Sequence, residues 1–495
     1  MTLNFKKIFI SNFSYLILIL LILPLFFINV TDSHDWGGDF AQYISQAKNI
    51  VEGKPHYETG YIFNEKVPAF GPRTYPPGFP LILSVPYSFF GNDIISFMYV
   101  VTLFLFLFAL VCYRLYRNYF NRLISLLIVL VTVYNPYMLS FKSEVMSDIP
   151  FSFLFILIFL LYRYRQKTLF NGFVIGLLIA FLIQIRTMGY VFLLSVFVNY
   201  LIILFGYKSK NADKPKVLFK YHLAIFLTSV IFILIFDYLL FPVPAAYSYS
   251  ELWLFENISD NLLKNLYNYL TELKWFFEPD VGLWSFSTII LASIAICFFI
   301  LGLFKNIVKK FSFMEILFII FISVTLIYPY NGGVRLLIPV LPFILIYIVE
   351  ALSESEYNFN FWKINFVSIF LILILITYIN GANKIIVNQK FTTEGPQKPD
   401  AIEIFEEIKN NTPEESVVAF IRPRVLALYT KRRSVSNGKL QNMQEIEDKF
   451  KEVKVEYILL HHFFHDKSLI KFLKLKHTEL EVMAKNKTFT LYKYK

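Results

Sequence analysis

Acidic residues between long apolar runs are the first candidates for chemistry in this chain. Asp39 follows Gly37-Gly38 and opens a segment with apolar residues at helical spacing, which predicts an amphipathic helix that lies along the outer membrane surface. A carboxylate at a membrane surface can remove a proton from an acceptor hydroxyl or amine, which is the work of a general base. An aspartate at the start of a helix is also an ordinary N-cap. The residue types alone leave both interpretations of Asp39 open.

A second acidic pair, Glu144 and Asp148, follows another apolar run. On a helix, carboxylates four residues apart would share one face. Acidic groups at a membrane boundary are costly unless they meet water, a cation or a functional partner. Both are therefore catalytic candidates. The structural alternative for Asp148 is the cap of a helix that has Pro150 in its first turn.

Four basic residues are candidates for binding a phosphate: Arg186, Arg335, Lys48 and Arg73. Arg186 and Arg335 stand at the ends of apolar runs, and a guanidinium forms a bidentate match with a phosphate. The structural alternative is an arginine that snorkels or pairs with a carboxylate. The stretch Tyr75-Pro76-Pro77 returns the chain toward the membrane. It is expected to contact a substrate, either the acceptor whose proton is removed or the donor that reacts with it.

Other motifs add little chemistry. His461, His462 and His465 lie together without a convincing further ligand set, so they are interpreted as a solvated turn after a strand, and metal ligands stay unknown. Neither a P-loop nor a dinucleotide-binding glycine fingerprint is apparent.

The composition indicates a polytopic membrane protein. The 495 residues are 56% hydrophobic and 19% aromatic, and the mean hydropathy is +0.55. The net charge of +11 lies largely in short clusters between apolar runs, which argues against a nucleic-acid partner. Cys112 and Cys297 both lie within apolar runs and are expected to act as small buried hydrophobic residues.

About eleven spans are expected from runs long enough to cross a bilayer, the first being a retained helix and not a cleaved signal peptide. They lie near residues 8–30, 93–113, 123–141, 149–162, 169–185, 188–206, 221–241, 284–304, 312–330, 335–350 and 363–380. With the N-terminus inside, seventeen Lys and Arg residues fall in inner loops and three in short outer loops. This asymmetry predicts a cytoplasmic N-terminus. The membrane is expected to be a bacterial plasma or inner membrane.

Three segments then face outward: 31–92, 242–283 and the region from about 383. In the last, helical spacing follows Pro399-Asp400, residues 417–421 and 457–460 resemble buried strands, and residues 488–492 alternate like an edge strand. The predicted organisation is a membrane catalytic domain, 1–382, with its outer loop at 31–92, and an extracytoplasmic α/β domain, 383–495.

In order and on one membrane side, these motifs resemble the GT-C glycosyltransferases, specifically the protein O-mannosyltransferase and aminoarabinose-transferase-like family (glycosyltransferase family 39 and relatives). The resemblance covers about the first 350 residues. The matching stretches are Gly38-Asp39 with Tyr43, Ala47 and Gly53, Tyr75-Pro76-Pro77-Gly78-Phe79-Pro80, Phe90-Gly91, Ser143-Glu144, Arg186-Thr187-Met188-Gly189 and Arg335 through Pro342.

The resemblance implies a membrane enzyme that takes a sugar from a polyprenyl-phosphate carrier and passes it to a glycolipid, a cell-envelope glycan or a protein. The family's catalytic first-loop acid maps onto Asp39. Many members have an Asp-Glu pair there, whereas this chain has Asp39-Phe40, so Glu144 or Asp148 would supply the second acid. A single displacement would invert the anomeric carbon, and a divalent ion could bridge carboxylate and phosphate but is not required.

Two alternatives come from other classes of protein. A flippase or transporter for lipid-linked sugar would use polar groups within the membrane, and Asp237 in the seventh span is the feature that favours it. A non-catalytic membrane scaffold would leave the tail as the working part.

Overall fold

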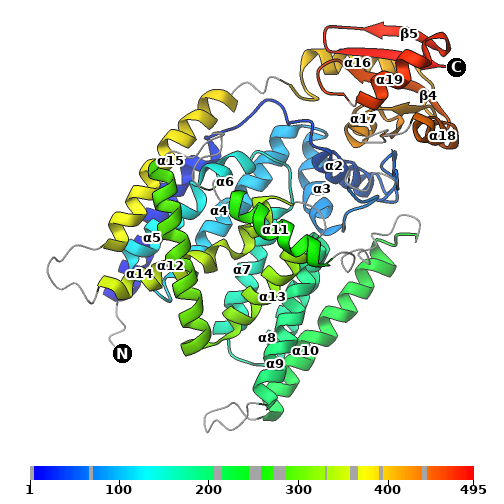
Figure 1. The fold of residues 1–495 in the computed structure, drawn as a ribbon. Coiled ribbons are helices and arrows are strands. Elements are labelled where there is room, and N and C mark those ends of the chain that lie inside the picture. The colour runs from blue at the N-terminus through cyan, green and yellow to red at the C-terminus, as the bar shows by residue number, and fades with distance from the viewer. Residues whose placement is uncertain are drawn as a thin grey trace. The chain divides into compact units, whose positions relative to one another are not determined.

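The computed structural model describes residues 5–65, 71–205, 215–244, 258–272, 276, 286–328, 332–356, 366–389, 394–436, 443–465 and 467–495 (Figure 1). The chain divides into two compact units. The membrane unit comprises Met1–Val30, Met98–Leu240 and Glu251–Lys390, and the loop–tail unit comprises Thr31–Phe97, Phe241–Ser250 and Phe391–Lys495. Of the predicted segment 242–283, residues 245–257, 273–275 and 277–283 lie outside the described residues.

The membrane unit is helical. Its helices are α1 (Phe5–Ile22), α4 (Ile94–Tyr116), α5 (Arg122–Val133), α6 (Pro136–Phe141), α7 (Asp148–Tyr164), α8 (Leu169–Ile185), α9 (Tyr190–Phe205), α10 (Pro215–Leu234), α11 (Ile258–Glu272), α12 (Phe286–Lys310), α13 (Phe313–Ile327), α14 (Leu341–Glu356) and α15 (Phe366–Gln389). Short 3-10 segments are η1 (Leu23–Phe26), η3 (Thr187–Gly189) and η8 (Val334–Val340), and α10 continues into a π-helix, Ile235–Leu240.

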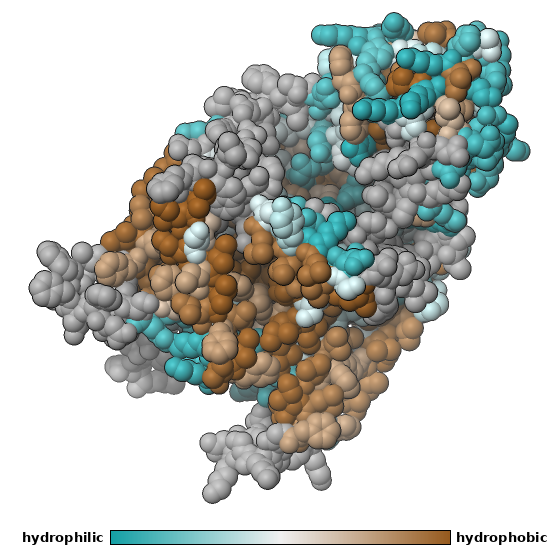
Figure 2. All heavy atoms as spheres, viewed as in Figure 1, coloured by the Kyte–Doolittle hydropathy of each residue, from teal (hydrophilic) through white to brown (hydrophobic). Residues whose placement is uncertain are grey.

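Within the described residues, six helices are long and apolar enough to cross a membrane, which makes this an integral membrane protein. They coincide with the predicted spans near 93–113, 188–206, 221–241, 284–304, 335–350 and 363–380. The other five predicted spans are shorter or interrupted helices. The span 123–141 is broken, because the Asn135 side chain caps a new helix that starts at Pro136. On the face drawn in Figure 2, hydrophobic residues predominate over the described helices of the membrane unit.

Small residues let some of these helices pack closely. α8 and α10 lie side by side (Figure 1), and a Cβ at Gly172 or Gly176 would come within 2.6 Å of a carbonyl oxygen of α10. Glycines four residues apart lie on one face of a helix and carry no side chain there, so the backbones of the two helices can approach closely. Such close packing holds helices together in lipid, where the hydrophobic effect between them is weak.

The loop–tail unit contains a six-stranded sheet in the order β1-β3-β2-β4-β6-β5. The strands are β1 (Tyr61–Ile62), β2 (Val417–Ala419), β3 (Arg433–Val435), β4 (Val455–His461), β5 (Leu480–Lys485) and β6 (Phe489–Tyr494). β1, β3, β2 and β4 run parallel, whereas β6 is antiparallel to both β4 and β5. The predicted α/β character is confirmed, but the predicted edge strand, β6, is internal because β5 covers it.

The helices of this unit are α2 (Gly38–Val51), α3 (Gly78–Phe90), α16 (Pro399–Asn411), α17 (Pro423–Thr430), α18 (Met443–Val453) and α19 (Lys467–Leu475). In α16 the buried residues are the four expected from helical spacing: Ala401, Ile404, Phe405 and Ile408. β1 comes from the first loop and pairs with β3 of the tail. The structure thus joins loop 31–92 to the region after 383, which the sequence assigned to separate domains.

Candidate active site

Helix α2 positions Asp39 in its first turn. The N-cap is Gly37, which offers no side chain, so the interpretation of Asp39 as an ordinary cap is wrong. Asp39 Oδ1 instead accepts a hydrogen bond from the Tyr75 hydroxyl at 2.8 Å and pairs with Nη1 of Arg424 at 3.1 Å. The helix dipole also favours a negative charge in this turn.

Polar residues of α2 fix the loop that carries Tyr75. Gln42 Nε2 donates to the Arg73 carbonyl at 2.8 Å, and Gln46 both donates to the Tyr75 carbonyl at 2.8 Å and accepts from its N–H at 3.1 Å. The Tyr75 ring stacks on Tyr43, with ring centroids 4.5 Å apart. Because these polar residues are buried with the apolar ones, α2 is not the one-sided surface helix that its apolar spacing predicted.

Arg424 of α17 is the functional candidate that sequence reasoning missed. Its side chain is buried, and Nη2 donates to the Pro72 carbonyl at 2.5 Å. The guanidinium lies over the rings of Tyr61 and Tyr75, at 4.8 and 5.4 Å from their centroids. In the sequence, Arg424 belongs to Arg422-Pro423-Arg424, where two charges around a proline are typical of a solvated turn. The burial of its side chain in the structure is what indicates a specific role.

The charge states of this network follow from its surroundings. Burial, and then the charge of Asp39, raise the pKa of Tyr75 well above its usual value. Burial alone would lower the pKa of Arg424, but Tyr75, Tyr61 and Asp39 raise it on balance. At neutral pH, Tyr75 is therefore a neutral hydroxyl donor and Arg424 a cation.

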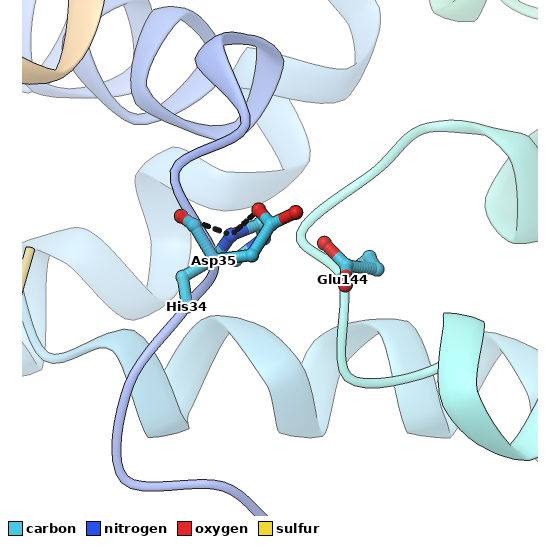
Figure 3. Close-up of side chains that lie close together, drawn as sticks. All are labelled: His34, Asp35 and Glu144. Atoms are coloured by element: carbon cyan, nitrogen blue, oxygen red, sulfur yellow. Dashed lines mark hydrogen bonds and ion pairs between the residues drawn. The ribbon is translucent and has the colours of Figure 1, made fainter. Parts of the chain in front are cut away.

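A second carboxylate lies just before α2. Asp35 Oδ1 accepts from the Gly37 N–H at 2.7 Å and lies 2.9 Å from Nδ1 of His34 (Figure 3). Burial tends to raise the pKa of Asp35, but the His34 side chain and the Gly37 N–H lower it overall. The charges of Asp35 and Asp39 both act on Arg422, so the two acids and this guanidinium are neighbours. His34 and Asp35 offer nitrogen and oxygen donors of the kind that divalent cations accept.

The other two acidic candidates belong to the membrane unit. Glu144, also labelled in Figure 3, lies in the turn between α6 and α7, and Asp148 opens α7 after Ser147. The two carboxylates therefore do not share a helix face. Arg186 Nη1 lies 2.7 Å from Asp148 Oδ1 and donates to the Ser147 hydroxyl at 3.2 Å. Arg186 thus pairs with a carboxylate, which was the structural alternative to binding a phosphate.

Arg335 lies in η8 and belongs to the same polar region. Its Nε donates to the Gly332 carbonyl at 3.0 Å, which curls the side chain over the start of η8. The charges of Arg335, Asp148, Glu144 and Glu272 all act on the phenol of Tyr137. Arg335, Asp148 and Glu144, three of the candidates predicted from the sequence, thus lie near one phenol in the membrane unit.

The remaining candidates have ordinary surroundings in the loop–tail unit. Arg73 pairs with Glu65 at 2.7 Å and lies over the Phe63 ring at 5.1 Å. Lys48 lies in the last turn of α2, where burial lowers its pKa. Pro76 precedes Pro77, which caps α3.

His461 is not part of a solvated turn. It ends β4 in a buried position, and its Nδ1 accepts from the backbone N–H groups of Phe463 and Phe464 at 3.2 and 3.0 Å. Its ring packs against those of Trp36 and Phe489. The residue is an element of the core.

The membrane unit also contains an apolar cavity of about 320 Å³. It is lined by residues of α5, α11, α12, α13, η8, α14 and α15, with Asn135, Tyr269 and Tyr378 among its few polar side chains. Such a lining suits a hydrocarbon chain more than a polar ligand.

Comparisons with known proteins match this description. Residues 74–236 match the family model described as dolichyl-phosphate-mannose-protein mannosyltransferase. ArnT from Cupriavidus metallidurans bound to undecaprenyl phosphate superimposes with a TM-score of 0.61 at 12% identity, covering 97% of this chain and 97% of that chain. No curated protein sequence matches the chain.

The oligosaccharyltransferase of Archaeoglobus fulgidus is also similar. Its apo form gives a TM-score of 0.60 at 13% identity, and its complex with zinc and sulfate gives 0.59 at 15%. The chain is covered to 90% in both cases, with 69% and 68% of those chains. At such identities the likeness establishes the fold. Together with the family model, it confirms the predicted resemblance to GT-C glycosyltransferases.

Proposed function

We propose that this chain is a membrane glycosyltransferase that transfers a sugar from a polyprenyl-phosphate donor to an extracytoplasmic acceptor, with Asp39 as the general base. The observation that carries the proposal is the state of Asp39: its carboxylate is 28% exposed, yet held by a buried guanidinium and a half-buried phenol. A base needs this combination of fixed geometry and access to a substrate proton.

The reaction is a single displacement. Asp39 takes the proton from the acceptor hydroxyl or amine while the acceptor atom bonds to the anomeric carbon. The bond from that carbon to the phosphate oxygen breaks, its electron pair leaves with the lipid phosphate, and the anomeric configuration inverts. The leaving phosphate needs charge stabilisation more than a proton, and Arg335 and Arg186 are the cations proposed for it.

The donor class is supported by the relatives and by the cavity. ArnT binds undecaprenyl phosphate in one structure, and the archaeal enzyme AglB was solved with an inhibitory peptide and a dolichol-phosphate. The apolar cavity of the membrane unit gives an isoprenoid chain a place to lie. A glycolipid, an envelope glycan or a protein would be the acceptor, and the active site and tail would face outward in a bacterial inner membrane.

A divalent ion is a further part of the proposal. One related structure contains zinc, and His34 and Asp35 supply donor atoms of the required kind. A bound ion would stabilise negative charge on the departing phosphate. Chelation of the purified enzyme followed by readdition of Zn²⁺, Mn²⁺ or Mg²⁺ tests this point.

Sugar transfer in proteoliposomes tests the function. The enzyme is given a panel of polyprenyl-phosphate sugars, and wild type is compared with Asp39→Asn and Arg335→Ala. We expect Asp39→Asn to bind donor without transferring sugar, and Arg335→Ala to bind donor more weakly. The matched control is Asp93→Asn, because the Asp93 carboxylate accepts a hydrogen bond from the Ser96 N–H and asparagine caps a helix equally well.

The outcomes separate the alternatives. A fully active Asp39→Asn refutes the assignment of the base. Movement of lipid-linked sugar across the bilayer without transfer would establish the flippase instead. Asp237, which favoured that alternative, accepts a hydrogen bond from Gln184 at 2.9 Å, a local partner for this carboxylate.

A further inference from the structure

The proposed base is held by a residue 385 positions away in the chain. Asp39 belongs to the first loop and Arg424 to α17 of the tail, and both lie in the loop–tail unit. We propose that Arg424 is a positioning residue that orients the Asp39 carboxylate for catalysis, so that the tail completes the active site. This inference rests on the proposed function and assigns the tail a part in it.

The burial of the pair is asymmetric in a way that fits this role. The Arg424 side chain is 2% exposed, whereas the Asp39 side chain is 28% exposed. Burying both charges would remove water's screening but would also cost the desolvation of a second ion. Here the cation is enclosed and the carboxylate remains accessible. The arrangement presents Asp39 to a substrate and hides the group that holds it.

The first loop is shaped around the guanidinium. Gly71 has φ of +91°, and a Cβ there would lie 2.6 Å from Nη2 of Arg424. Nη2 donates to the carbonyl of the next residue, Pro72, while Nη1 reaches Asp39 and lies 3.4 Å from the Tyr75 hydroxyl. One planar group thus fixes the loop backbone, the carboxylate and the phenol together.

A lysine could not make this set of contacts. The two terminal nitrogens of Arg424 form hydrogen bonds with different partners, the Asp39 carboxylate and the Pro72 carbonyl. The flat face of the guanidinium lies over the rings of Tyr61 and Tyr75. An ammonium has a single nitrogen and no flat face, so it would satisfy one partner at the expense of the others. Tyr61 is itself placed by the pairing of β1 with β3.

Holding Asp39 beside a guanidinium affects how the transfer rate depends on pH. A guanidinium this close favours the charged form of a carboxylate, so its removal makes Asp39 easier to protonate. Since Tyr75 and Arg424 both have raised pKa values, neither titrates on the acidic side of neutrality. Neither residue can therefore shift the acid limb of the transfer rate, the part of the pH profile where the rate falls as pH decreases. A shift of that limb when Arg424 is replaced reports a carboxylate that the guanidinium had held in its charged form.

The test uses the protein in proteoliposomes and measures transfer from about pH 3.5 to 9, because an aspartate beside a guanidinium titrates at or below about pH 4. It also measures donor binding and thermal stability. We expect Arg424→Gln to lose about 100-fold in transfer rate at neutral pH, the effect of a misplaced catalytic group, with donor binding retained. The acid limb should move up by about one pH unit. Arg424→Lys should recover the position of the limb but little of the rate.

The matched control is Arg432→Gln. Arg432 is also buried in the tail, but it donates to neutral oxygens of Lys409, Thr412 and Thr430. It should lower stability and leave the acid limb in place. A folded Arg424→Gln with the parental rate and limb overturns the inference, as does a loss that Arg432→Gln reproduces without any shift of the limb.

The failure of this inference is distinct from failure of the proposed function. If Asp39→Asn is inactive while Arg424→Gln behaves like wild type, only the positioning role falls. If Asp39→Asn is fully active, the base itself is wrong and the Arg424 result has no bearing on it.

Discussion

Removing the guanidinium of Arg186 should destabilise the membrane unit strongly, because it leaves a buried charge behind. Asp148 is 2% exposed and pairs with Arg186 at 2.7 Å. Its Oδ2 has no hydrogen-bond partner among the described residues. Breaking a buried pair from one side costs about 3–5 kcal/mol. Arg186 is 22% exposed, so the lower end, about 3 kcal/mol, is expected for Arg186→Gln.

Removing both charges should cost less. In Arg186→Gln with Asp148→Asn, two neutral amides replace the pair and no ion is left in a dry site. We expect a loss of about 1 kcal/mol, which is about 2 kcal/mol less than for Arg186→Gln alone. The double-mutant cycle that includes Asp148→Asn then gives the coupling energy of the pair.

The chain supplies its own reporter for this measurement. Cys112 in α4 is fully buried, and Cys297 is exposed. In a Cys297→Ser background, a thiol reagent labels Cys112 only when the membrane unit opens. If opening is fast relative to labelling, 3 kcal/mol corresponds to roughly 150-fold faster labelling.

Two results would refute this reasoning. One is an Arg186→Gln protein labelled at the parental rate, which would mean that Asp148 is not stranded by the loss. The other is a double variant that is labelled as fast as the single one. Asp148→Asn alone is the matched control, since it leaves the more exposed charge, Arg186, and should cost less.

Three further outcomes follow from individual residues. Burial lowers the pKa of His461 to about 4, so as pH falls the His461 imidazole is protonated in the unfolded chain before it is protonated in the folded one. The free energy of unfolding should therefore decrease below about pH 6.5, by at most about 3 kcal/mol near pH 4. Thermal midpoints measured across this pH range test the prediction. Gly71→Ala should reduce transfer as Arg424→Gln does, because the new methyl displaces the guanidinium. Gly302→Ala should lower the thermal midpoint, with a loss of about 1–3 kcal/mol, because its Cβ would overlap the Tyr347 carbonyl of α14.

Each of these has a control. His461→Gln should flatten the pH dependence, and an unchanged slope would assign it to other groups. Gly53→Ala introduces an alanine at φ of +67° with no heavy atom within 4 Å of its Cβ, so it should leave transfer near the parental rate. An unchanged midpoint for Gly302→Ala would mean that α12 and α14 can separate at little cost.

Local pattern was enough for much of the fold. α16 begins with a proline at N1, and its apolar residues recur at helical spacing, so each residue of its buried face could be predicted. The break at Asn135-Pro136 was also readable, since asparagine followed by proline is a helix start, but the apolar run around it favoured one continuous span. β1 has two residues and no pattern of its own, and its place depends on a distant partner.

The candidate site divides in the same way. Asp39 could be found because it follows two glycines at the start of an apolar helical pattern. Arg424 could not, since no local spacing distinguishes it from a surface charge. Its importance arises from contacts made with residues 39, 72 and 75, which are set by tertiary folding. Pairing of Arg186 with Asp148 likewise required the three-dimensional arrangement.

The pairing of β1 with β3 sets an order of events during synthesis. Tyr61 is opposite Ser434, and 373 positions separate them in the chain. At about 5–20 residues per second, the ribosome needs roughly 20–75 s to make the intervening chain. Throughout that interval β1 lacks its neighbour from the tail and Asp39 lacks Arg424. A nascent chain that has not yet reached residue 424 would therefore carry the acidic loop without its support, and the site would be complete only after α17 and β3 have been made.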